Sequence, residues 1–463
     1  AIGNDAVQEA HTWGMSLPAT KHNQHVTSAD QIPDNIREAF HLASTGRKGP
    51  VLVDIPKDVL AETMTWHRPG EVRLPGYRPA VKGHPRQVKA AVDLIEQAER
   101  PVLYVGGGVV AADATEELQR FAEMLDVPMV TTLMARGAFP DSNPLNLGMP
   151  GMHGTYAATT AMQRSDLLIT IGARFDDRIT GNPKHFAPEA KVIHVDVDPA
   201  EIGKIRVADV PVVGDARSVL QQLIVETERR GPQPDRAEWL AVVHGWETAH
   251  PLSYVQDPDG PIQQQYVIEE LHRITDGDAT IVAGVGQHQM WASQFWGFDE
   301  PRRWINSGGL GTMGYAIPAA IGAKAGTPDQ VVFAIDGDGC FQMTGTELIT
   351  AAVENIPIKI AVMNNQSLGM VKQWQNLFYD GRLSQTELSP TVPDFVKFAE
   401  ACGCVGLRAD RPDEVAGVIE QALAINDRPV LVEFTCDPES MVFPMVPAGG
   451  SNDDVILSRE DLA

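Results

Sequence analysis

Short apolar runs alternate with amphipathic stretches along much of this chain, a pattern typical of α/β folds built on parallel sheets. Between residues 89 and 230, four such runs predict buried strands: Val102–Val105, Met129–Thr132, Leu167–Ile171 and Val192–Val197. Stretches with helical periodicity separate these runs. We therefore predict a doubly wound sheet in this part of the chain.

Similar patterns lie on either side of this region. Near the start, a predicted helix at 32–45 precedes a strand at Val51–Ile55 that Pro56 ends. In residues 263–463 we predict strands at Val331–Ile335, Ile358–Met363 and Val430–Phe434, and helices near 393–401 and 412–425. The predicted fold is thus three doubly wound parallel-sheet α/β domains, of which the first is incomplete.

Two segments rich in Pro, Gly and charge show no periodicity and are interpreted as linkers, at 66–88 and 231–262. They divide the chain into a first unit at 1–65, a central unit at 89–230 and a third unit at 263–463. The chain begins at Ala1 in the middle of a sequence pattern, so we expect that part of the first domain lies upstream. The presence of a targeting segment therefore cannot be judged from this sequence.

Composition narrows the classes of partner. A formal charge of −24 argues against nucleic acid and anionic membranes, because binding phosphates on that scale needs a basic face. No apolar run approaches the length of about 18 to 20 residues of a membrane span. The four cysteines lack the spacing of a metal site, which fits a reduced, cytoplasmic location.

The most informative chemistry lies between Gly337 and Asn365. The turn Gly337–Gly339 follows one predicted strand, and Thr344 and Glu347 have the spacing of a capping box that would begin a helix. The next strand ends just before Asn365. Because parallel strands joined by a helix lie side by side, Asp338 and Asn365 should meet at one sheet edge and offer oxygen ligands to Mg²⁺. Phosphate and water would complete the coordination; the alternative is an ordinary turn and an ordinary strand end.

The central unit carries weaker signals of nucleotide binding. Gly106, Gly107 and Gly108 directly follow a predicted strand, GARFDDRITG at 172–181 follows another, and Asp196 and the VVGDA segment at 212–216 stand at strand ends. Backbone that approaches a nucleotide closely needs glycine. Taken singly, each could also be a tight turn or an exposed ion pair.

Together these motifs resemble a known family. A GDG sequence followed by NN after about two dozen residues resembles the diphosphate motif of thiamine-diphosphate enzymes. Further segments resemble acetohydroxyacid synthase, also called acetolactate synthase, and the resemblance extends over almost the whole chain. These segments are TKHN at 20–23, GMPGMHG at 148–154, GVGQHQMWASQ at 284–294, SGGLGTMGYAIPAAIGA at 307–323 and NNQSLGMVKQWQNLFY at 364–379. The resemblance is to the large catalytic subunit.

The resemblance implies a reaction and its cofactors. Pyruvate would be decarboxylated on thiamine diphosphate, and the hydroxyethyl carbanion would add to pyruvate or 2-ketobutyrate, toward branched-chain amino acids. The side chains of Asp338 and Asn365 and the Ser367 carbonyl would hold Mg²⁺. Met343 would support the bent cofactor, although a methionine in a helical pattern is normally a core residue. The residues implied to contact thiamine diphosphate are Val285, Gly286, Gln287, His288, Gly311, Met313, Gly337, Asp338, Gly339, Cys340, Asn365, Gly369 and Met370.

In the resembling family FAD has a structural role. The implied contacts are Gly106, Gly107, Gly108, Thr132, Leu133, Met152, His153, Gly172, Arg174, Arg178, Ile179, Asp196, Val197, Gly214, Asp215 and Ala216. His22 and His153 could instead be hydrogen-bonded structural residues, and for His22 we favour that interpretation.

The resemblance also implies the substrate pocket. Arg178 would bind the carboxylate of the second 2-keto acid and Trp374 would test the size of its alkyl group. Without the resemblance, the sequence alone would suggest that Arg178 is a surface cation and Trp374 an interface aromatic. Lys21 and Gln8 match positions that face the active site from the first domain. Val7 stands where the family has phenylalanine, which makes substrate preference harder to predict.

One family residue has no counterpart in this sequence. The glutamate that starts catalysis on the cofactor lies upstream of the segment at which this chain begins, so we expect the polypeptide as given to be inactive or nearly so. The family also implies a homodimer or homotetramer and a small regulatory subunit. The competing interpretations are pyruvate oxidase, a glyoxylate carboligase and a noncatalytic paralogue.

Overall fold

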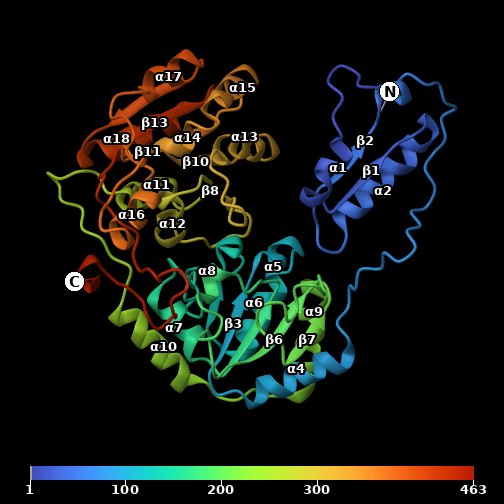
Figure 1. The fold of residues 1–463 in the computed structure, drawn as a ribbon. Coiled ribbons are helices and arrows are strands. Elements are labelled where there is room, and N and C mark those ends of the chain that lie inside the picture. The colour runs from blue at the N-terminus through green and yellow to red at the C-terminus, as the bar shows by residue number, and fades with distance from the viewer. Residues whose placement is uncertain (1–2, 463) are drawn as a thin grey trace.

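The computed structural model describes residues 3–462, and in these residues all strand ladders are parallel (Figure 1). The ladders form three separate sheets of two, five and six strands. This arrangement confirms the prediction of parallel-sheet α/β architecture. Among the described residues, no helix combines the length and the apolar composition that crossing a membrane would require.

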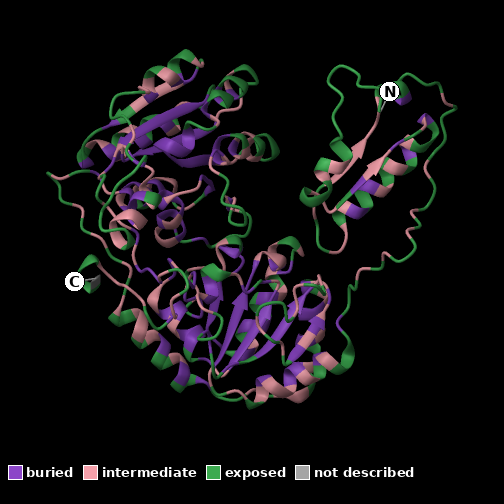
Figure 2. Cartoon of the chain, viewed as in Figure 1, coloured by how far each residue is buried: buried purple, intermediate pink, exposed green. Residues whose placement is uncertain are grey.

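The five-stranded sheet forms the centre of the middle unit, with strand order β4-β3-β5-β6-β7. Its strands are β3 (Pro101–Val105), β4 (Met129–Thr131), β5 (Leu167–Ile171), β6 (Lys191–Asp196) and β7 (Val210–Val213). β3 and β5 are buried along their whole length, because helices cover both faces of the sheet (Figure 2). The predicted strands of this unit are confirmed to within one or two residues at each end.

Helices on the two faces bury two separate apolar cores. One core lies under α4 (Pro85–Gln97), α6 (Thr115–Leu125) and α9 (Ala216–Arg230), and the other under α7 (Tyr156–Arg164) and α10 (Ala237–Ala249). α10 lies within the predicted linker 231–262, where it buries Trp239 and Val243. The short α5 (Gly107–Ala111) and α8 (Asp177–Thr180) follow β3 and β5.

The six-stranded sheet has the order β12-β13-β11-β10-β8-β9. Its strands are β8 (Ala279–Ala283), β9 (Trp304–Asn306), β10 (Val331–Gly337), β11 (Lys359–Asn364), β12 (Val405–Ala409) and β13 (Val430–Thr435). One face packs against α11 (Gln264–Thr275), α12 (Gln287–Phe295) and α18 (Pro412–Ala424), and the other against α13 (Ala316–Gly326), α15 (Leu348–Val353) and α17 (Phe395–Ala401). Two more helices, α14 (Asp338–Phe341) and α16 (Gly369–Phe378), begin just after β10 and β11.

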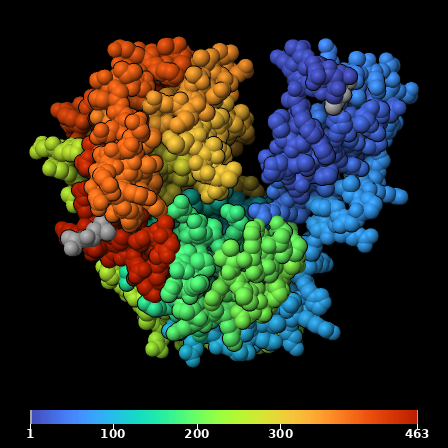
Figure 3. Space-filling model, in the orientation of Figure 1, coloured from blue at the N-terminus to red at the C-terminus, as the bar shows by residue number. Residues whose placement is uncertain are grey.

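The first unit is small. Its residues from 3 onward form two strands, β1 (His22–His25) and β2 (Val51–Asp54), joined by α2 (Ile32–Ser44), with α1 (Thr12–Ser16) and α3 (Lys57–Leu60) beside them. Residues 61–84 then run to α4 without a helix or strand. In Figure 3 the molecule is hollowed between this unit and the third unit. The domain boundaries themselves stay a prediction.

Two local expectations around Gly337 are wrong. Gly337 is the last residue of β10 and Asp338 is the first of α14, so the GDG segment is a strand-to-helix junction rather than a turn. Thr344 and Glu347 form no capping box, because the Thr344 hydroxyl donates to the Gly314 carbonyl at 2.6 Å. A partner distant in the sequence has replaced the local one that the spacing suggested.

Candidate functional site

A cavity of about 1060 Å³ lies where the carboxyl ends of the five-stranded and six-stranded sheets face each other. Loops after β3, β5 and β6 line one side, and residues after β8, β10 and β11 line the other. Residues 46–48 reach it from the first unit. Parallel sheets bind ligands at this edge, since strand ends and helix starts converge there.

Asp338, Asn365 and Ser367 form a buried polar corner of this cavity. β10 and β11 are neighbours in register, with Gly337 opposite Met363, so Asp338 and Asn365 follow adjacent strand ends as predicted. The Asp338 Oδ1 accepts from the Gly339 amide at 2.8 Å, while its Oδ2 and the Ser367 Oγ have no hydrogen-bond partner among the described residues. Oxygen atoms left free in this way are the donor set that Mg²⁺ prefers.

The charge at this corner depends on what binds there. Burial raises the pKa of Asp338 to about 7, although the amides of Gly339, Gln366 and Ser367 pull that pKa down. A cation beside the carboxylate would favour its ionised form. The Asp338 carboxyl group therefore ionises more readily when a cation binds beside it.

Gln287, the first residue of α12, holds the corner in place. Its Oε1 accepts from the Asn365 amide at 3.2 Å, and its Nε2 donates to Gln373 Oε1 at 3.0 Å and to the Ser440 carbonyl at 2.9 Å. Gly369 lies against the same side chain, since a Cβ there would come within 2.1 Å of Gln287 Oε1. These contacts join α12 and α16 to the loop after β11.

On the central side, the glycines after β3 pack against the loop after β5. A Cβ on Gly106 would lie 2.3 Å from the Gly172 carbonyl oxygen, and Gly172 itself has φ +59°. Close packing of two loops thus accounts for Gly106 without a ligand. The same residues still line the cavity.

The acidic residues on this side fall into two groups. Asp176 and Asp215 cap α8 and α9 through hydrogen bonds to backbone amides, which is a structural role. Asp196 accepts from the Asp198 amide at 2.8 Å, and burial raises its pKa. Within residues 3–462, none of the four charged residues of the RFDDR motif forms an ion pair, so the ion-pair alternative is not supported.

Arg178 and Trp374 meet at the edge of the cavity although 196 positions separate them in the sequence. The guanidinium carbon lies 6.0 Å from the indole ring centroid, and the guanidinium contacts Met152 Sδ at 3.3 Å. A second hollow of about 710 Å³ opens beside them, lined by both residues and by Met370, Val371, Gln375, Tyr379 and Arg382. This cation and indole could receive a small carboxylate.

Nearly all other predicted site residues line the large cavity. They include Val285, Gly286, His288, Gly311, Met313, Gly339, Cys340 and Met370 on one side, and Gly107, Gly108, Thr132, Leu133, His153, Arg174, Ile179, Val197, Gly214 and Ala216 on the other. Their contacts to cofactors stay predictions.

Three predicted residues are not brought to the cavity in this chain. Met343 is 59% exposed and does not line it. Gln8 is exposed, and the Lys21 ammonium donates to the Thr45 carbonyl at 2.6 Å and to the Tyr77 hydroxyl at 3.0 Å. Lys21 is thus held within the first unit. The neighbouring Val7 is 93% exposed.

Sequence reasoning also missed residues beside the cavity. Arg47 lines it and forms ion pairs with Asp198 at 3.0 Å and Glu201 at 2.7 Å. Asp336 lies just behind it, fully buried in β10 with both carboxylate oxygens unpartnered. A charged residue inside the apolar run VVFAID was the one signal that could have drawn attention to Asp336.

Comparison with known proteins adds family information. Residues 284–434 match the family described as thiamine pyrophosphate enzyme, C-terminal TPP binding domain, and residues 88–223 match the thiamine pyrophosphate enzyme central domain. An acetolactate synthase of Mycobacterium bovis is 58% identical over 463 residues, which is 99% of this chain and 75% of that protein.

Two further relatives carry related names. The acetolactate synthase large subunit of Corynebacterium glutamicum is 56% identical over 98% of this chain and 73% of its own length. The acetolactate synthase isozyme 3 large subunit of Escherichia coli is 43% identical over 99% of this chain and 81% of its own length.

Proposed function

Because this chain belongs to the acetolactate synthase large-subunit family of thiamine pyrophosphate enzymes, we propose that it joins a two-carbon unit from pyruvate to a second 2-keto acid. Pyruvate or 2-ketobutyrate would be that second acid, as in branched-chain amino acid biosynthesis in the cytoplasm. The observation that carries this proposal is the corner of Asp338, Asn365 and Ser367 in a cavity shared by two sheets, where Asp338 Oδ2 and Ser367 Oγ lack hydrogen-bond partners among the described residues.

The residues fit the cofactors that the proposal requires. Asp338, Asn365 and Ser367 would hold Mg²⁺, and the backbone around Gly337 and Gly339 would approach the diphosphate closely. Thiamine diphosphate, when bound, supplies the electron sink for breaking and making the bond next to the carbonyl carbon. FAD would lie along the loops after β3 and β5, with Asp196 within reach of its ribose hydroxyls.

The chain's own side chains would bind and orient the second substrate. The Arg178 guanidinium offers a charged fork to its carboxylate, and the Trp374 indole limits the space for its alkyl group. Pyruvate oxidase and glyoxylate carboligase remain the alternative activities, and a noncatalytic paralogue remains the alternative of another class.

Paired variants test this assignment. We expect Asp338→Asn to weaken Mg²⁺-dependent binding of thiamine diphosphate, because the carboxylate ligand is lost, while FAD binding is kept. Asp196→Asn should do the reverse. Calorimetric titration with thiamine diphosphate and flavin absorbance of the purified chain are the two measurements. Unchanged thiamine diphosphate binding by Asp338→Asn would contradict the assignment.

Activity and assembly need separate experiments. Acetolactate formation from pyruvate distinguishes the proposed reaction from oxidation or glyoxylate condensation. We also propose a homodimer or homotetramer that binds a small regulatory subunit. Light scattering of the purified chain measures the first of these, and a monomer at micromolar concentration would count against it.

A further inference from the structure

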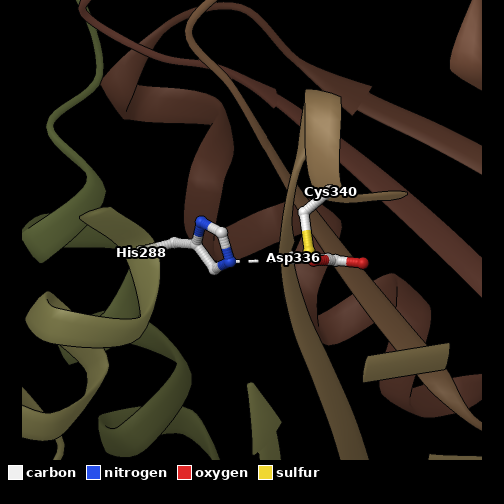
Figure 4. Close-up of side chains that lie close together, drawn as sticks. All are labelled: His288, Asp336 and Cys340. Atoms are coloured by element: carbon white, nitrogen blue, oxygen red, sulfur yellow. Dashed lines mark ion pairs between the residues drawn. The ribbon is translucent and has the colours of Figure 1, made fainter. Parts of the chain in front are cut away.

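A second cluster of potential ligands lies behind the corner just described. His288 of α12, Asp336 of β10 and Cys340 of α14 are 4%, 0% and 2% exposed. One potential ligand atom from each lies within 4.8 Å of the other two, and the His288 Nε2 is 3.6 Å from the Asp336 Oδ1. Figure 4 shows the imidazole and the thiol both pointing toward the carboxylate.

Two of the three side chains in this cluster carry atoms without hydrogen-bond partners. Both Asp336 carboxylate oxygens and the His288 Nε2 have no hydrogen-bond partner among the described residues. Burying such groups without partners costs free energy, so a carboxylate and an imidazole that face one centre beside a thiol indicate a ligand site.

Backbone amides fix the position of the Cys340 sulfur. The Cys340 Sγ accepts hydrogen bonds from the amides of Val285 at 3.3 Å and Gly314 at 3.1 Å. These two contacts hold the sulfur beside the carboxylate. The surrounding backbone fits closely, because a Cβ on Gly284 would lie 1.9 Å from Asp336 Oδ1 and 2.8 Å from Cys340 Sγ.

We propose that His288, Asp336 and Cys340 form a binding site for a single thiol-seeking divalent cation, with Zn²⁺ as the best fit. A thiolate and a carboxylate carry two negative charges, which one divalent cation neutralises, and the imidazole ligates as the neutral form. Binding releases the Cys340 proton to solvent. Sulfur and nitrogen ligands favour Zn²⁺ or Co²⁺ over Mg²⁺, whose site at Asp338 offers oxygen alone.

The spacing of His288 and Asp336 fits tetrahedral coordination. Two ligands of one Zn²⁺ are about 3.3 to 3.8 Å apart when each bond is about 2.0 to 2.3 Å. The His288 to Asp336 distance of 3.6 Å already falls in that range. His288 and Cys340 line the large cavity, so the fourth position opens toward it, as in zinc sites that keep a place for water or a substrate oxygen.

The first test titrates the complete chain with CoCl₂, with excess Mg²⁺ and without thiamine diphosphate, so that the result is independent of the proposed function. We expect one Co²⁺ per chain, with a sulfur-to-cobalt charge-transfer band and the visible bands of tetrahedral Co²⁺. Cys340→Ser should abolish the charge-transfer band and weaken binding by at least about 100-fold, the upper end of what loss of an outer-shell partner costs.

Cys404→Ser is the matched control, because Cys404 is also a buried free cysteine of the third unit but lies outside the cluster. It should keep the band. A band that survives Cys340→Ser, or the absence of any charge-transfer band in the unmodified chain, would overturn the proposal.

A second measurement needs no variant and so does not depend on whether Cys340→Ser folds. X-ray absorption at the zinc edge of the Zn²⁺-loaded chain should find one sulfur at about 2.3 Å with nitrogen and oxygen ligands at about 2.0 Å. A coordination shell of nitrogen and oxygen alone would refute the site.

Discussion

Single buried side chains determine how the cavity responds to protons. Burial raises the pKa of Asp338 to about 7, and it lowers the pKa of His288 to about 3 and that of His153 to about 4. The shifts have opposite directions because burial disfavours whichever form is charged. The two histidines therefore stay neutral, while the aspartate is the group that a cation can ionise near neutral pH.

His153 makes this behaviour measurable through stability. The unfolded chain protonates this imidazole near pH 6.5 and the folded chain only near pH 4, so the unfolded state binds more protons between these values. Stability from this residue therefore rises with pH across that window. We expect His153→Asn to reduce the stability difference between pH 5 and pH 7.5 by roughly 2 kcal/mol. Urea unfolding of both proteins at the two pH values measures this, and equal differences would contradict it.

The space around Asp336 gives a second prediction at this scale. Gly284→Ala would place a methyl group 1.9 Å from Asp336 Oδ1, so we expect a loss of about 1 to 3 kcal/mol through overpacking. Gly322→Ala is the control, because no atom lies within 4 Å of its added Cβ in α13, and a gain of up to about 1 kcal/mol is expected there. Thermal unfolding compares the two. Equal effects would show that the close approach at Gly284 costs nothing.

At the scale of elements, helices and loops distant in the sequence are joined at the site by buried amide side chains. Gln373 of α16 is 1% exposed and accepts from Gln287 Nε2 at 3.0 Å and from the Val442 amide at 2.8 Å. Its Nε2 donates to the Val442 carbonyl at 3.0 Å. One side chain thus fixes α12 and α16 against the C-terminal segment.

Removing this connection should be costly. Gln373→Leu leaves the buried amide and carbonyl of Val442 unpartnered, so we expect a loss of about 3 kcal/mol. In Gln221→Leu, an exposed glutamine on α9 loses one hydrogen bond to Glu117, and the change should stay within about 0.5 kcal/mol. Chemical unfolding of both variants tests this, and similar losses would mean that the buried network adds nothing.

At the scale of the whole molecule, the first unit is attached loosely compared with the other two. Residues 61–84 connect it without regular structure, and across the gap Arg47 contacts Asp198 and Glu201 while Lys48 donates to the Ala111 carbonyl at 2.6 Å. The central and third units, by contrast, share the walls of one cavity.

This difference predicts where a protease cuts first. We expect trypsin to cut first after Arg73, because the segment around it is exposed and contains no helix or strand, whereas Arg68 and Arg78 each precede a proline that blocks trypsin. The expected product begins at Leu74 and stays folded. Mass spectrometry of a brief digest identifies the cut, and Arg73→Gln should slow it. A first cut inside the central or third unit would show that the units differ less in stability.

Much of the fold and part of the site could be predicted because the information is local in the sequence. Buried parallel strands are continuous apolar runs, and strand order along the chain places Asp338 and Asn365 at neighbouring strand ends. Thr344 was predicted wrongly because a carbonyl 30 residues away competes with a local cap. Met343 lies exposed at the surface, and its position likewise depends on which elements pack beside it rather than on its neighbours in the sequence.

The sequence by itself determined the α/β class, the resemblance to acetohydroxyacid synthase and the polar residues at the strand ends, because periodicity and motif spacing are properties of the chain alone. Only the tertiary structure decided that Arg178 meets Trp374, and that His288, Asp336 and Cys340 share one buried centre. The physical reason is that each of these contacts joins different elements. Their distances are set by how sheets and helices pack, and no short segment of sequence contains that information.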